Sequence, residues 1–104
     1  MNKVYLIAII ISVAGCATLS NLQPKESDIT KMQQKVPGIT FEEAKKGFKL
    51  YKANCAGCHS LYKPADYTIA GWDKNLIEMF PKAKMNNDSV GRSQIRKYLY
   101  ALSK

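Results

Sequence analysis

The sequence predicts an all-α fold, and two observations support this class. Apolar side chains recur at three- and four-residue spacings in three segments, and no segment shows strand-like alternation or an internal repeat. The chain has 104 residues, so it holds one domain at most. Once an N-terminal export signal is removed, the remainder is too short to build a large core, and we expect a bound group to help hold the fold together.

The first predicted helix begins after Thr40. The run Thr40-Phe41-Glu42-Glu43 has the form of a capping box, in which the threonine hydroxyl serves backbone N–H groups and Glu43 reaches back. One face of this helix carries apolar or small residues at helical spacing up to Asn54: Ala44, Gly47, Phe48 and Tyr51. We therefore predict a folded domain over residues 40–104.

Two further helices are predicted after a loop that ends near Pro64. The first of them carries an apolar face at helical spacing, made of Trp72, Leu76, Met79 and Phe80. We expect Pro81 to end it, because the residue before a proline disfavours helical geometry. The last helix is predicted from about Asp88 to Leu102, with an apolar face of Ile95, Tyr98, Leu99 and Leu102.

Residues 1–15 are predicted to be an export signal, because a positively charged start precedes an apolar run too short to span a membrane. The run ends in Val13-Ala14-Gly15-Cys16, which resembles the lipobox of bacterial lipoproteins. That resemblance implies cleavage before Cys16 and attachment of diacylglycerol to its sulfur. We expect an exported protein, lipid-anchored to a bacterial membrane and facing the periplasm or the cell exterior. The alternatives are an uncleaved anchor or an ordinary signal followed by a chance cysteine.

Residues 16–39 are predicted to be the lipidated cysteine and a flexible tether. From Ala17 onward the composition shifts to polar residues interrupted by Pro24 and Pro37, which argues against a core helix. A flexible tether of this length spans roughly 25 Å on average. The folded domain would then reorient freely near the membrane surface.

The segment Cys55-Ala56-Gly57-Cys58-His59 predicts covalent attachment of one haem c. Two thiols three positions apart can each bond a vinyl group on one porphyrin edge, and the adjacent His59 is placed to ligate the iron. A thioredoxin-like dithiol would need a βαβ context, which the sequence does not predict. A zinc site usually needs four ligands, and with Cys16 lipidated only three Cys and His side chains are available.

Residues 40–104 resemble the class I cytochrome c family. Gly47 and Tyr51 precede the haem motif with the spacing of that family's N-terminal helix, and the run from Ile95 to Leu99 is similar to its C-terminal helix. The resemblance implies a small helical domain wrapped around one covalent haem, with the two helices crossing at Gly47 against Tyr98. It also suggests that the Pro64 carbonyl accepts a hydrogen bond from the His59 ring. Trp72 would either donate to a haem propionate or cover the apolar core.

The resemblance further implies a methionine as the sixth iron ligand, and the sequence offers Met79 and Met85. We favour Met79, because it leaves more chain before the last helix to wrap the far side of a haem. Met79 also lies just ahead of Pro81, where the chain is expected to turn. Met85 has an alternative role as a hydrophobic staple before the caps of the last helix, and Met79 could equally be a core residue.

The charge of the chain points to acidic redox partners. Sixteen Lys and Arg against eight Asp and Glu give +8, and loss of Lys3 with the signal leaves +7. The lysines are scattered and no nucleic-acid motif accompanies them, so we expect no nucleic-acid partner. No catalytic residue set is present, and we expect a one-electron carrier, without a small-molecule substrate, rather than an enzyme. The alternatives are a ligand-binding or sensing haem protein with an open sixth position, and a structural subunit of a larger oxidoreductase.

Overall fold

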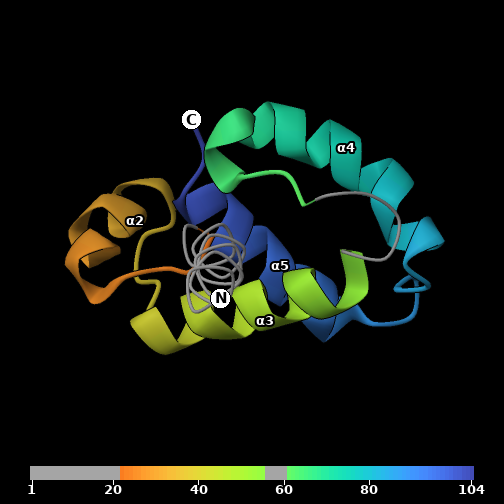
Figure 1. Cartoon of the computed structure of the whole chain (residues 1–104), viewed down its shortest axis with the longest axis horizontal. Coiled ribbons are helices and arrows are strands. Elements are labelled where there is room, and N and C mark those ends of the chain that lie inside the picture. The colour runs from red at the N-terminus through yellow and green to blue at the C-terminus, as the bar shows by residue number, and fades with distance from the viewer. Residues whose placement is uncertain (1–21, 56–60) are drawn as a thin grey trace, which may run out of the picture.

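The computed structural model describes residues 22–55 and 61–104, and this part of the chain is helical without strands. The elements follow one another along the chain (Figure 1): the 3₁₀ turn η1 (Glu26–Asp28), α2 (Ile29–Lys35), α3 (Phe41–Cys55), the 3₁₀ turn η2 (Pro64–Asp66), α4 (Ile69–Lys82) and α5 (Ser89–Ala101). The all-α class predicted from the sequence is confirmed. Among the described residues, no helix combines the length and the apolar character needed to cross a bilayer.

Helix α3 begins at the predicted capping box. The Thr40 hydroxyl accepts the Glu43 N–H at 3.1 Å, and a Glu43 carboxylate oxygen accepts the Thr40 N–H at 3.1 Å. The other carboxylate oxygen of Glu43 accepts a 2.7 Å hydrogen bond from Lys97 on α5. The Lys97 ammonium, with the Thr40 N–H, holds the pKa of Glu43 below its ordinary value. The cap that starts α3 therefore also joins it to α5.

Helices α3 and α5 cross at Gly47, as the family resemblance implied. A Cβ atom placed on Gly47 would lie 2.2 Å from the Gln94 carbonyl oxygen and 2.5 Å from Cβ of Tyr98. Both distances are far below van der Waals contact, so only glycine allows the two backbones to approach this closely. The Tyr98 ring packs against Phe48 and Tyr51, with ring centroids 5.7 and 5.9 Å away.

Helix α4 continues through Pro81 and ends at Lys82, so the prediction that Pro81 ends the helix is wrong. A proline in the last turn removes only one intrahelical hydrogen bond, and the stop comes from the residues after it. Lys84 has a positive φ of 59°, its N–H donates to the Pro81 carbonyl, and the Met85 N–H donates to the Phe80 carbonyl. This is a Schellman motif, and it brings Met85 against Phe80 in the core. Asp88 then caps α5 by accepting the Gly91 N–H at 2.8 Å.

The flexible tether predicted from composition is not what the structure shows for residues 22–39. Helix α2 lies within this segment, and its Met32 is fully buried together with Ile39, Ala44 and Ala101. The prediction from composition was wrong because a helix can pack against a core with only a few apolar residues when they fall at helical spacing, as Met32 and its neighbours do. The residues before Leu22 lie outside the described part of the chain.

Candidate functional site

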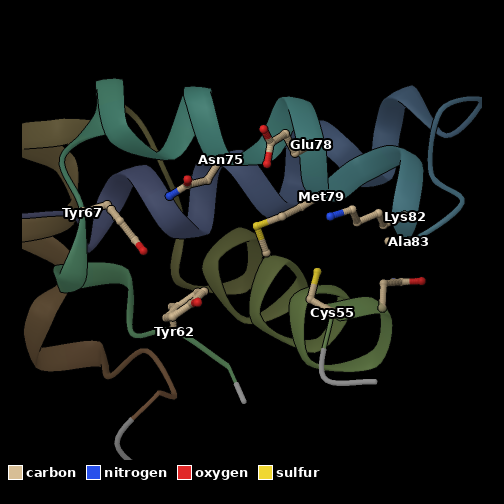
Figure 2. A pocket seen from close by; sticks show the side chains of 9 residues that line it. Cys55, Tyr62, Tyr67, Asn75, Glu78, Met79, Lys82 and Ala83 are labelled. Carbon is tan, nitrogen blue, oxygen red and sulfur yellow. The ribbon is translucent and has the colours of Figure 1, made fainter. Parts of the chain in front are cut away.

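Cys55, the first cysteine of the haem motif, is the last residue of α3 and is buried. It follows Tyr51 by one helical turn, so the same periodicity that buries Tyr51 turns Cys55 toward the interior. Figure 2 shows its sulfur pointing into a pocket between the end of α3 and helix α4. The other predicted site residues Cys16, Cys58 and His59 lie outside the described residues.

The pocket has a volume of about 310 Å³, which is at the lower end for small-molecule sites. It is lined from α3, from the loop before α4 and from α4 itself: Asn54, Cys55, Tyr62, Tyr67, Asn75, Glu78, Met79, Lys82 and Ala83. Two aromatic rings, one thiol and one thioether share this space with one carboxylate and one ammonium group. The lining thus suits a partly apolar group with polar substituents.

Met79 and Met85, the two candidate sixth ligands, occupy different environments. Met79 is half-buried and lines the pocket, and its sulfur points into the pocket on the side opposite Cys55 (Figure 2). Met85 is 3% exposed, packs in the main core cluster and is not among the lining residues. Val90, in the first turn of α5, is 67% exposed, so the burial of Met85 comes from the main core cluster.

Two hydrogen bonds fix the wall of the pocket on the side of the loop. The Tyr51 hydroxyl donates to the Tyr62 carbonyl at 2.9 Å, which ties α3 to the chain that follows the haem motif. Burial raises the pKa of the Tyr51 hydroxyl, so it remains a donor. The Trp72 indole N–H donates to the Pro64 carbonyl at 2.8 Å, and the Trp72 side chain is fully buried.

These hydrogen bonds bear on the roles suggested for Trp72 and Pro64. Indole has a single N–H, and because Pro64 accepts it, Trp72 is a core residue here and not a propionate donor. A carbonyl oxygen has a second lone pair, so Pro64 keeps the capacity to accept from another donor. The Tyr67 ring packs edge-on against Trp72 at 5.0 Å and extends the same wall.

Helix α4 contributes polar pocket residues that sequence reasoning missed. Asn75, Glu78 and Lys82 lie at i, i+3 and i+7, on the side of α4 that also carries Met79, which the sequence analysis had already named as a candidate ligand. The same spacing was readable in the sequence, but polar residues at helical spacing usually mark a solvent-exposed face. Only the position of α4 relative to Cys55 shows that this face lines a pocket.

The donor set is compatible with a haem attached at Cys55. A thiol and a thioether facing one pocket match one attachment point and one axial ligand of a c-type haem. Within residues 22–55 and 61–104, no group of three or more His, Cys, Asp and Glu side chains is arranged to hold a metal ion. No protein-family model matches the chain, and neither curated proteins nor solved structures show significant similarity to it.

Proposed function

We propose that this protein is a lipid-anchored monohaem c-type cytochrome that carries single electrons between redox partners. Cys55 and Cys58 would hold the haem through thioether bonds, and His59 and Met79 would ligate its iron. The observation that carries the proposal is the Cys55-x-x-Cys58-His59 motif, whose first cysteine opens onto the same pocket as Met79. The described helices would then form a cytochrome c-like fold wrapped around the haem.

The haem would supply the chemistry, since its iron accepts and releases one electron at a time. The chain would supply position and environment. Tyr51 and Trp72 hold the loop after the motif against the core through their hydrogen bonds to Tyr62 and Pro64. A thioether ligand from Met79 would favour ferrous low-spin iron and raise the potential. The hydrogen bonds of Tyr51 and Trp72 hold the loop rigidly, and this would limit structural rearrangement when the haem gains or loses an electron.

Redox partners with acidic docking surfaces fit the charge of the chain. The sequence carries a formal charge of +8, and opposite charge on a partner speeds diffusional encounter. The lipid on Cys16 would hold the carrier at a bacterial membrane, on the periplasmic or outer side, so that encounter is confined to that surface.

The test compares three forms of the protein made under the same conditions. In the wild type we expect one haem that stays on the polypeptide after denaturation, because thioether bonds do not depend on the fold. The double variant Cys55→Ser, Cys58→Ser should lose covalent haem. Ala56→Ser, which keeps all three motif side chains and a small residue between them, should retain it. Haem staining of the denatured band and visible spectra provide the measurement.

Three results would count against the proposal. Covalent haem in the double cysteine variant, or none in the wild type, would refute the attachment. A carbon monoxide complex that forms readily on the reduced wild type would instead favour the ligand-binding or sensing haem protein, because it shows an open sixth position.

A further inference from the structure

One side of α3 carries three lysines at helical spacing, Lys45, Lys49 and Lys52, which we call the basic flank. Lys45 is paired with Glu42 at 3.0 Å, whereas no carboxylate among the described residues pairs with Lys49 or Lys52. The Lys52 ammonium lies 5.3 Å from the centroid of the Phe48 ring, a cation–π contact that restrains the flexible side chain. The flank therefore presents uncompensated positive charge at a defined place on the fold.

The described chain begins against this flank. Gln23 and Pro24 line a groove of about 230 Å³ together with the three lysines, Phe41 and Phe48. Leu22 is buried, and its carbonyl accepts a hydrogen bond from the Tyr98 hydroxyl in the core. Figure 1 shows these first described residues (orange) leading from the α3 side of the molecule to α2. The start of the folded part is thus fixed beside the lysines.

Chain length limits how far the lipid-bearing residue can be from that point. Cys16 precedes Leu22 by six residues, which span at most about 21 Å when fully extended. This is close to the length of α3, since a 15-residue helix is about 22 Å long. A lipid on Cys16 would therefore keep the basic flank within reach of the headgroups, instead of letting the domain reorient on a long tether.

The pocket and the basic flank share α3 but do not coincide. Lys45 on the flank and Asn54 at the pocket are nine residues apart, which is two and a half turns of an α-helix, so they point in opposite directions. Lys52 and Cys55 are three residues apart, so the end of the flank lies beside the pocket. None of the three flank lysines lines the pocket itself.

We propose that the basic flank docks on anionic phospholipid headgroups and orients the anchored domain. The proposal rests on the lipidation of Cys16 that is part of the proposed function. An acidic protein could also bind lysines, but the fixed position of Leu22 puts the flank next to the anchor, where the membrane is the nearest surface. Lysines close to an anionic membrane each contribute about fivefold in binding.

The experiment places the full-length lipidated protein in vesicles and measures how fast an amine-reactive reagent labels each lysine. Phosphatidylglycerol vesicles supply anionic headgroups, and phosphatidylcholine vesicles supply neutral ones. We expect Lys49 and Lys52 to be labelled several-fold more slowly on phosphatidylglycerol at low salt, and the protection to disappear at high salt. Lys63 and Lys74, which are exposed and lie outside the flank, serve as internal references and should show no protection.

A matched pair of variants sharpens the measurement through Lys45, the lysine that remains on the flank. Replacing Lys49 and Lys52 with glutamine should reduce the protection of Lys45 on phosphatidylglycerol by about fivefold or more. Replacing Lys63 and Lys74 with glutamine removes the same charge and should leave Lys45 as protected as in the wild type.

Each outcome supports or overturns docking of the basic flank on anionic headgroups. Equal labelling of the flank and reference lysines, or protection that is the same on phosphatidylcholine, overturns the proposal. Protection by added polyglutamate but not by phosphatidylglycerol also overturns it, in favour of an acidic protein partner. The mass of the purified protein reports the lipid on Cys16 separately, and haem staining reports the haem. Protection of the flank lysines in a protein without lipid would support docking of the flank on headgroups and refute lipidation of Cys16. A lipid on Cys16 without protection of the flank lysines would support lipidation and refute docking.

Discussion

The middle and the C-terminal end of α3 are packed in opposite ways. At Gly47 the helix touches α5 so closely that a single added methyl group would overlap a backbone carbonyl. Two turns further on, Cys55 opens onto a pocket of about 310 Å³. Protein interiors are usually packed to high density, so a pocket of this size beside a buried thiol is not the ordinary result of helix packing. The described side chains close the crossing at Gly47 and leave a pocket beside Cys55.

This difference separates the part of the fold that the polypeptide stabilises alone from the part suited to a bound group. The crossing is held by Gly47, Tyr98 and the ion pair between Glu43 and Lys97, all within the chain. The pocket is bordered by Cys55 and Met79, whose sulfur atoms lie on opposite sides of it (Figure 2). Under the proposed function, the haem would complete the core at this end.

The largest effect on stability is expected from adding a methyl group at Gly47, where α3 and α5 cross. Gly47→Ala gains helix propensity, but its methyl group would meet the Gln94 carbonyl and Cβ of Tyr98, neither of which can rotate away. Overpacking of this kind costs about 3 kcal/mol, at the upper end of the usual range, and we expect the free energy of unfolding to fall by that amount. Urea denaturation followed by circular dichroism measures it.

Gly71→Ala in α4 is the matched control for this prediction. The nearest atom to a methyl group there is the Tyr67 Cβ at 3.3 Å, a contact that a small shift relieves. We expect the control to change the free energy of unfolding by less than about 1 kcal/mol. Similar losses in the two variants would show that α3 and α5 do not cross as tightly as described.

The second largest effect is on stability and on the visible spectrum, and it distinguishes Met79 from Met85. Met85→Ala removes a buried side chain from the main core and should cost about 2–3 kcal/mol of stability. The methionine-to-iron charge-transfer band of the oxidised protein should survive. Met79→Ala removes a half-buried side chain at the open end, and we expect it to abolish that band. Visible spectra and urea denaturation of both variants provide the measurement.

The reverse pattern, with the band lost in Met85→Ala and kept in Met79→Ala, would refute the assignment of Met79. Absence of the band from the wild type would point to the ligand-binding haem protein, because the sixth position would then lack methionine.

The features predicted correctly from the sequence depend on local signals or on one close contact. The capping box at Thr40 follows from chemistry within four residues. The contact of Gly47 with Tyr98 was implied by the family resemblance, and the structure contains it. The end of α4 was missed because Lys84 adopts positive φ, which its residue type does not signal. The folding of residues 22–39 was missed because the stability of α2 comes from tertiary packing of Met32 and not from composition. The pocket wall from α4 required the same tertiary information.

The smallest effect is a loss of stability at alkaline pH that originates at the crossing. Burial raises the pKa of the Tyr51 and Tyr98 hydroxyls above the ordinary value of 10. Both hydroxyls therefore keep their protons in the folded state at pH values where the unfolded chain has lost them. They contribute no pH dependence well below pH 10. Above it they lower the free energy of unfolding, by at most about 1.4 kcal/mol per pH unit for each tyrosine.

Tyr98→Phe isolates the contribution of this hydroxyl from the rest of the chain. All other titratable groups are common to both proteins, so a difference in slope between their stability curves above pH 10 reports the Tyr98 hydroxyl. The variant also loses the hydrogen bond to the Leu22 carbonyl, but that loss is present at every pH and displaces the curve without changing its slope. We expect a shallower decline in Tyr98→Phe than in the wild type, measured by urea denaturation at a series of pH values. Parallel curves would contradict the prediction, because they would mean that water reaches the Tyr98 hydroxyl and that the crossing is open where Gly47 requires it to be closed.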